Sequence, residues 1–209
     1  MSASDRPTTF HFGGQVALVT GSGRGLGRMI AETLLKGGAH VALHDISEDA
    51  PAAFGEAESL TALAGELSAR GPGKVTAVIG DISKEADVAA LVKKVEGGLG
   101  PISILVNCAG GDIAAKGGKP NPNDALNISL EDAHAVMNRN FIGTMLMCRA
   151  VVPGMAARSA GSRCATDCTV SPAMRRPGNR ASSSMPAGRR CARPCPRDEA
   201  ARSRKIKFF

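Results

Sequence analysis

The sequence predicts an α/β fold with a doubly wound parallel sheet. Short apolar runs alternate with segments of helical period, a glycine-rich turn joins the first such pair, and polar residues follow three of the apolar runs. Strands that alternate with helices form parallel sheets with right-handed crossovers. Ligands bind such sheets beyond the carboxyl ends of the strands, so the sequence predicts a site at that edge.

The first unit consists of a strand, a glycine turn and a helix. Residues 15–20 form an apolar run, and residues 21–27 read Gly-Ser-Gly-Arg-Gly-Leu-Gly. Apolar residues then recur at helical spacing until Gly37 and Gly38 end the helix. Glycine lets the backbone turn tightly and approach a pyrophosphate, whose charge the first helical amides stabilise. In this context the glycine pattern predicts dinucleotide binding.

Three further strands and three further helices are expected, with a polar loop at 110–127. The predicted strands are 40–44, 74–79 and 102–106. The predicted helices are 57–69, 86–95 and 129–152. The breakers expected to end these helices are Gly71, Gly97 and Pro153.

Four motifs in order resemble the short-chain dehydrogenase/reductase family over residues 13–157. The turn at 20–27 is similar to the family's Thr-Gly-x-x-x-Gly-x-Gly, and residues 107–110 are similar to its Asn-x-Ala-Gly. Asp81 and Asn140 match the family's adenine-binding aspartate and its catalytic asparagine. The resemblance implies a Rossmann-type sheet with a nicotinamide cofactor. It also implies an oxidoreductase that moves hydride between this cofactor and an alcohol or ketone, such as a polyol or sugar.

The resemblance implies cofactor contacts from four segments of the chain. The residues are Gly21, Ser22, Arg24, Gly25, Leu26, Gly27, Asp45, Asp81, Ile82, Asn107, Ala109 and Gly110. Asp45 ends the second strand, where a carboxylate accepts hydrogen bonds from the ribose hydroxyls of NAD. The same carboxylate would repel the 2′-phosphate of NADP, by roughly 4 kcal/mol at about 4 Å and an effective dielectric near 20. Arg24 either favours NADP or lies in solvent; Asp45 is the more direct contact, so NAD is the expected cofactor.

The family pattern stops near residue 157. The resemblance implies that a strand with a catalytic serine comes next, followed by a helix with Tyr-x-x-x-Lys. This chain contains no tyrosine, and no lysine lies between Lys119 and Lys205. Of the family's catalytic tetrad only Asn140 is assigned. We therefore expect impaired catalysis and a sheet that is incomplete after the fourth strand and the following helix.

Residues 158–209 differ in composition from the Rossmann-type part of the chain, residues 1–157. Arg, Ala, Ser, Pro, Gly and Cys fill 38 of these 52 positions. The segment has 13 basic residues (Lys and Arg) and 3 acidic residues (Asp and Glu), whereas residues 1–157 have 13 basic and 16 acidic residues. Such a segment buries too little apolar surface to offset its ordering entropy, so we predict that it is disordered. The abrupt change predicts a reading-frame shift near residues 158–163. The fourth strand is then expected to be an apolar edge that is prone to aggregation.

Two other interpretations of the chain remain open. In the first, the chain is a non-catalytic nucleotide-binding remnant with a basic tail. In the second, the pairs Cys164 with Cys168 and Cys191 with Cys195 bind zinc in a nucleic-acid-binding tail, although no aromatic residue lies between the pairs. Arginines bind polyanions without specificity, so no specific nucleic acid partner is expected. The segment between the cysteine pairs also has no apolar core, and three-residue spacing is less usual than two for zinc, so no metal is expected.

Composition also predicts the cellular setting. Residues 1–14 hold no apolar core of a secretory signal, and no apolar run approaches the ~20 residues of a membrane helix. Cys108 and Cys148 are interpreted as small buried residues of a reducing compartment, so a cytoplasmic location is expected. Intact members of the family are usually homo-oligomers, and this chain is not expected to assemble normally. The histidines are expected at the surface or at strand ends: His11, His40, His44 and His134.

Overall fold

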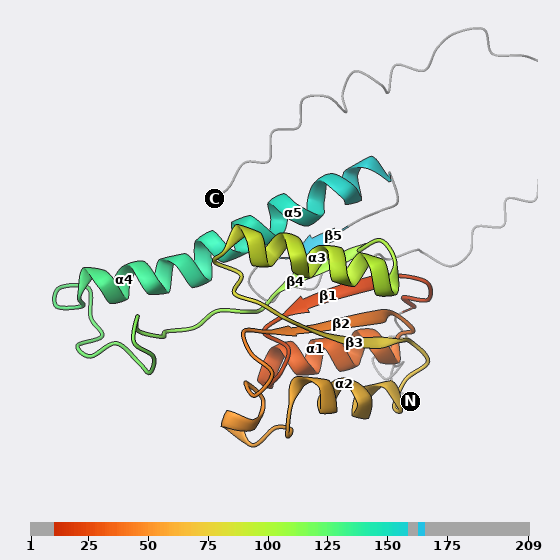
Figure 1. Cartoon of the computed structure of the whole chain (residues 1–209), viewed down its shortest axis with the longest axis horizontal. Coiled ribbons are helices and arrows are strands. Elements are labelled where there is room, and N and C mark those ends of the chain that lie inside the picture. Colours follow the sequence, from red (N-terminus) through yellow and green to blue (C-terminus); the bar gives the residue numbers. More distant parts are fainter. Residues whose placement is uncertain (1–10, 159–162, 166–209) are drawn as a thin grey trace, which may run out of the picture. The chain divides into compact units, whose positions relative to one another are not determined.

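The computed structural model describes residues 11–158 and 163–165, which form a parallel sheet between two layers of helices (Figure 1). The strands are β1 (Val16–Thr20), β2 (His40–Asp45), β3 (Val75–Ile79), β4 (Ile104–Asn107) and β5 (Arg163–Ala165). The helices are α1 (Gly25–Lys36), the 3₁₀ turn η1 (Ala52–Phe54), α2 (Leu60–Ser68), α3 (Glu85–Leu99), α4 (Leu130–Met137), the π-helical segment η2 (Asn138–Ile142) and α5 (Gly143–Ala157). The strand order β3-β2-β1-β4-β5 confirms the predicted doubly wound fold.

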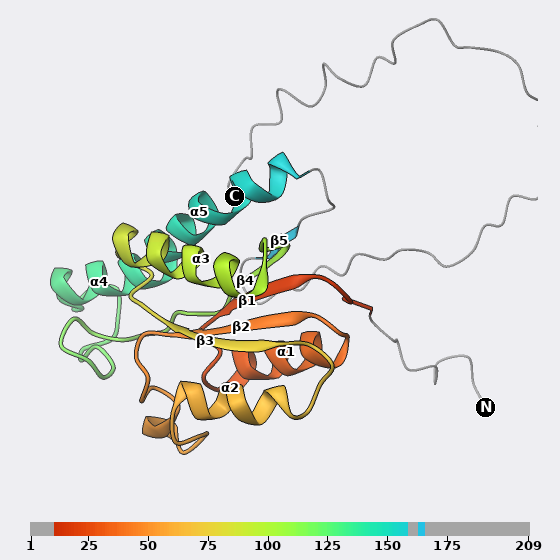
Figure 2. The ribbon, with the colours of Figure 1, turned by 45° about the vertical axis from the view of Figure 1, so that its right-hand side comes forward.

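Two apolar cores hold the sheet between its helices. α1 and α2 cover one face of the sheet, and α3 and α5 cover the other (Figure 2). In β1, Ala17 and Val19 lie in the first core, whereas Val16 and Leu18 lie in the second. Every residue of β1 is buried, as expected for a parallel strand covered on both faces. The carboxyl ends of the strands thus project from a rigid support.

Two helices run past the residues that were expected to end them. α3 continues through Gly97 and Gly98 and ends at Leu99, followed by the capping residue Gly100, whose φ is +98°. α5 continues through Pro153, and Met155 beyond it is buried against the sheet. Glycine costs roughly 1 kcal/mol and proline about 3 kcal/mol in a helix interior. The apolar packing of both helices on the sheet offsets these costs, which the local sequence alone does not reveal.

A short fifth strand extends the sheet. Residues 163–165 pair in parallel with residues 104–106. The prediction that the sheet ends at its fourth strand, with that strand as an open edge, is therefore wrong for these residues. The predicted disorder of the tail concerns residues 159–162 and 166–209, which lie outside the described part of the chain.

The continuous helix from α4 to α5 ends at Ala157, beyond the expected end at residue 152. By length and composition alone its 28 residues, Leu130–Ala157, are enough to cross a membrane. Charged residues such as Glu131, Arg139 and Arg149 interrupt it, so it holds no continuous apolar run of ~20 residues. Met147, Val151 and Met155 on this helix are buried in the core under α3 and α5. Packing on the sheet accounts for that part of its apolar composition. Phe141 on the same helix is exposed.

Candidate functional site

The glycine turn leads from β1 into α1 at the carboxyl edge of the sheet. Gly21 and Gly25 have φ values of +63° and +54°, which side chains other than glycine rarely adopt. A Cβ on Gly21 would lie 2.7 Å from the Cα of Ala109, and a Cβ on Gly27 would overlap the carbonyl oxygen of Gly21. The turn therefore packs closely against itself and against the residues that follow β4.

The outer side of the same turn is open. Apart from its chain neighbours and the nearby backbone of α1, no atom of the described residues lies within 4 Å of the point where a Cβ on Gly25 would lie. Arg24 and Leu26 on either side are exposed, and the Arg24 side chain makes no capping hydrogen bond to α1. A turn that is packed on one side and open on the other, at a helix N-terminus, fits the pyrophosphate of a dinucleotide.

Thr20 joins the turn to the Asn-x-Ala-Gly segment. Its buried hydroxyl accepts hydrogen bonds from the amides of Cys108 at 3.1 Å and Ala109 at 3.0 Å. The hydroxyl also lies 3.4 Å from the carbonyl oxygen of Val106, to which it donates. Two motifs nearly ninety positions apart thus meet at one side chain. We did not select Thr20 from the sequence, although it opens the glycine motif.

Asp45 lies directly against the glycine turn. Its Oδ2 accepts a hydrogen bond from the amide of Gly23 at 3.2 Å, and its Oδ1 accepts one from the amide of Ile46 at 2.9 Å. The guanidinium of Arg24 points elsewhere, because its carbon lies 3.3 Å from the ring centroid of Phe54. The carboxylate is therefore held in the turn by two amides, and the cation stacks on an aromatic ring.

The carboxylate of Asp81 is held within its own loop. Its Oδ1 accepts hydrogen bonds from the amide and the hydroxyl of Ser83, at 3.0 and 2.7 Å, and Lys84 lies 3.5 Å from Oδ2. Partial burial opposes the charge, but the Ser83 hydrogen bonds and the nearby ammonium lower the pKa of Asp81. Ile82 is buried in the core, against the first residue of α5, Gly143. A Cβ on Gly143 would lie only 2.7 Å from the Ile82 side chain. Asp81 thus reaches the site edge, whereas Ile82 positions α5.

Ser22 and His44 form a buried polar contact beneath the turn. The amide of His44 donates to the Ser22 hydroxyl at 2.9 Å, and the amide of Ser22 donates to the His44 carbonyl at 2.9 Å. The Nε2 of His44 lies 3.0 Å from the carbonyl oxygen of Gly80, whereas its Nδ1 has no hydrogen-bond partner among the described residues. His44 is only 2% exposed, so the expectation of a surface or strand-end histidine misses its burial. The backbone of His44 thus joins β2 to the turn, and its imidazole joins β2 to the residue that follows β3.

Acidification is expected to destabilise the protein through His44. Burial lowers the pKa of His44, while the Gly80 carbonyl and the charges of Asp45 and Asp81 partly oppose the shift. The unfolded chain therefore takes up this proton first, and the free energy of unfolding should fall as the pH drops below about 6.5. Urea unfolding between pH 7.5 and 5 should show that His44→Asn flattens this slope. Replacing the exposed His134 by Asn should leave the slope unchanged; equal slopes for both variants would contradict the assignment.

Asn107 lies at the end of β4, next to α5. It is buried, its Nδ2 donates to the Sγ of Cys148 at 3.6 Å, and its Oδ1 has no partner among the described residues. The amide oxygen of Asn107 can therefore accept a hydrogen bond from a group that is not among the described residues. Cys148 is half-buried, as is Cys108 on the other side of Asn107.

Asn140 lies in the π-helical segment between α4 and α5. Its Oδ1 accepts the amide of Gly111 at 2.8 Å, and its Nδ2 donates to the carbonyls of Gly111 and Val136, both at 2.9 Å. A Cβ on Gly110 would overlap Oδ1. The side chain therefore fastens the loop after β4 to the helix, at the kind of helix irregularity that often marks functional sites.

The predicted site residues thus gather at one edge, with Ile82 beneath it. Among the described residues, no group of three or more His, Cys, Asp or Glu side chains is placed to hold a metal ion. Of the four tail cysteines, Cys164 lies in β5 and the other three lie outside the described residues.

Comparison with known proteins identifies the family. The model of the short chain dehydrogenase family matches residues 15–166, which is nearly three quarters of the chain and includes the glycine turn, Asp45, Asn140 and β5. The chain belongs to this family.

Individual short-chain dehydrogenases are similar over the same region. Glucose 1-dehydrogenase of Gluconobacter oxydans is 36% identical over 146 residues, which cover 70% of this chain and 48% of that protein. Oxidoreductase UcpA of Escherichia coli is 35% identical over 148 residues, covering 71% and 49%. The structure of L-sorbose reductase from Gluconobacter frateurii, complexed with NADPH and L-sorbose, matches with a TM-score of 0.60 and 28% identity, covering 72% and 51%.

The chain spans about half the length of these short-chain dehydrogenases. The family match ends at residue 166, nine residues beyond the limit of 157 that the motifs suggested. The nine include β5. Residues beyond 166 are not matched by the family model, in keeping with their different composition.

Proposed function

We propose that this short-chain dehydrogenase chain binds NAD and belongs to an enzyme that moves hydride between the nicotinamide and an alcohol or ketone. The observation that carries the proposal is the glycine turn, which leaves the Cβ position of Gly25 open and bears the Asp45 carboxylate on the amide of Gly23. In this role the turn would hold the pyrophosphate, and Asp45 would accept the ribose hydroxyls. The bound nicotinamide supplies the hydride chemistry.

The remaining site residues have supporting roles in this proposal. Asp81 would contact the adenine, and Ala109 and Gly110 would border the cofactor where Thr20 holds the segment. Ser22 and Gly27 would shape the turn, and Asn107 would support the sheet. Arg24 would lie at the adenosine end, stacked on Phe54.

Asp45→Ala is expected to narrow the preference for NAD over NADP by about tenfold or more, because the change removes both the ribose acceptor and the repulsion of the 2′-phosphate. Titration calorimetry with both dinucleotides measures the two dissociation constants. Asp49→Ala is the control. Asp49 is an exposed acid between β2 and α2, and its replacement removes the same charge as Asp45→Ala does. Equal or tighter binding of NADP by the unchanged protein would refute the NAD assignment.

The substrate proposed is a small alcohol or ketone, and a polyol or sugar is favoured. The loop between β4 and α4 is polar, and two similar proteins are named for sugars, glucose 1-dehydrogenase and L-sorbose reductase. We propose a cytoplasmic location without membrane or specific nucleic acid partners. A non-catalytic nucleotide-binding protein is the second candidate function, since the chain lacks tyrosine. Turnover of NAD with a panel of secondary alcohols, measured on this chain and on a chain with the missing catalytic residues restored, distinguishes the two.

A further inference from the structure

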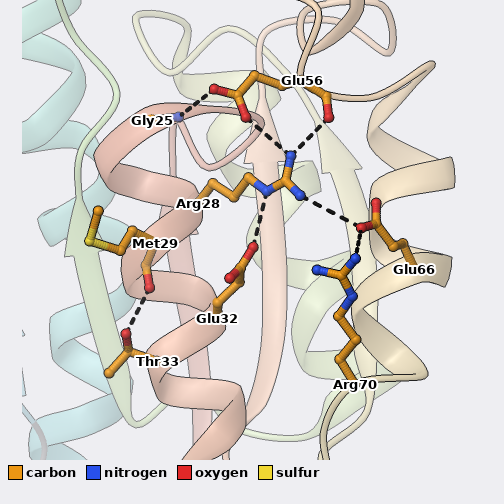
Figure 3. Close-up of polar contacts among 8 residues, drawn as sticks. All are labelled: Gly25, Arg28, Met29, Glu32, Thr33, Glu56, Glu66 and Arg70. Carbon is orange, nitrogen blue, oxygen red and sulfur yellow. Dashed lines mark hydrogen bonds and ion pairs between the residues drawn. The ribbon is translucent and has the colours of Figure 1, made fainter.

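A cluster of charged side chains joins α1, α2 and the connection between β2 and α2 (Figure 3). Arg28 is at its centre and lies 3.0 Å from Glu32, 3.1 Å from Glu56 and 3.7 Å from Glu66. Arg28 also donates to the backbone carbonyl of Glu56 at 2.8 Å. Arg70 makes a further ion pair with Glu66. Partial burial opposes the charge of Arg28, but Glu32 first, then Glu66 and Glu56, raise its pKa.

Arg28 holds Glu56 against the start of α1. Figure 3 shows the Glu56 carboxylate between the Arg28 guanidinium and the backbone of Gly25. Its Oε1 lies 3.5 Å from the amide nitrogen of Gly25, the first residue of the helix, and its Oε2 faces Arg28. The Glu56 side chain is 35% exposed, so its charge also faces solvent at the turn.

Two carboxylates therefore occupy amides of one glycine turn. Asp45 accepts the amide of Gly23, and Glu56 accepts the amide of Gly25. Both acids come from β2 and the connection that follows it, and Pro51 in that connection lies 3.0 Å from the point where a Cβ on Gly23 would lie. The connection is thus packed onto the turn with its acids directed at the amides.

We propose that Glu56, positioned by Arg28, is a second residue that sets the preference for NAD over NADP. This inference rests on the proposed function. At the adenosine end of the cofactor, a 2′-phosphate carries roughly two negative charges where NAD has a neutral ribose hydroxyl. There its charge meets the carboxylate of Asp45 and also that of Glu56, and like charges repel. NAD lacks this phosphate, so Glu56 affects it less.

The test measures dissociation constants for NAD and NADP by titration calorimetry on the full chain. Glu56→Gln keeps the shape of the side chain and the backbone carbonyl that Arg28 contacts, but it removes the charge. We expect the ratio of the NADP to the NAD dissociation constant to fall by about three- to tenfold at low salt. At 1 M salt, where the Debye length is about 3 Å, the difference from the unchanged chain should shrink.

Glu66→Gln is the matched control. Glu66 contacts the same guanidinium, but no contact between it and the turn is found in the described part of the chain. Glu66→Gln should leave the ratio of the NADP to the NAD dissociation constant within about twofold of that of the unchanged chain, because the charge that it removes is not at the turn. An equal effect of both variants, or no effect of Glu56→Gln while Asp45→Ala changes the ratio, would overturn the inference and leave the proposed function intact. If the unchanged chain bound neither dinucleotide, both this inference and the proposed function would be refuted.

Discussion

The 209-residue chain is expected to oxidise secondary alcohols with NAD no faster than buffer does. The chain has no tyrosine to transfer the proton and no lysine between Lys119 and Lys205. General acid–base help is worth about 10²–10⁴-fold in rate. The family resemblance implies that the lysine contacts the nicotinamide ribose, so we expect that contact to be lost as well. Steady-state assays with a panel of secondary alcohols, followed by the absorbance of reduced nicotinamide, check this expectation.

Restoring the missing residues should recover the activity. We expect the coding DNA near residues 158–163 to hold an alternative frame that encodes a serine and Tyr-x-x-x-Lys. A chain translated in that frame should be faster by about 10²-fold or more. Calorimetry with NAD on both chains separates lost chemistry from lost folding, because the cofactor turn precedes the change. Robust turnover by the chain as written, or coding DNA without such a frame, would refute the frame-shift hypothesis.

Gly27→Ala is expected to destabilise the protein by about 3 kcal/mol and to abolish dinucleotide binding. The new Cβ would overlap the carbonyl oxygen of Gly21, which belongs to the backbone and cannot rotate away. α1 would have to move off the turn, and buried Ile30 and Leu34 would lose their packing against the sheet. Urea unfolding measures the loss of stability.

Gly65→Ala is the matched control for Gly27→Ala. Gly65 lies in the interior of α2 and is exposed. Apart from its chain neighbours and the nearby backbone of α2, no atom of the described residues lies within 4 Å of its Cβ position. The same change there should stabilise the protein by about 0.5–1 kcal/mol, since alanine is the better helix former. If Gly27→Ala were as stable as the unchanged protein, the close packing of the turn would be contradicted.

Much of the fold and of the site could be predicted because local sequence carries the signals. The apolar runs at β1 and β4 and the helical spacing in α1 are properties of adjacent residues. Gly21 and Asp45 could be selected because a tight turn and a strand end leave local patterns. Their meeting at one edge follows from the parallel order of strands.

Other features were not predictable from local patterns. Neither Thr20 nor Arg28 was selected, because their partners lie far along the chain, near Cys108 and Glu56. His44 reads as an ordinary strand residue, and its burial depends on the neighbouring strand and the turn.

The sequence by itself determined the order of strands and helices, the glycine turn and the acid that ends β2. These follow from side-chain periodicity and backbone conformational preference, which act between near neighbours. Only the tertiary structure decided that α5 runs through Pro153, that β5 covers part of β4, and that Arg28 holds Glu56 at the turn. Each depends on the free energy of contacts between distant segments, which outweighs local preference once the sheet brings them together.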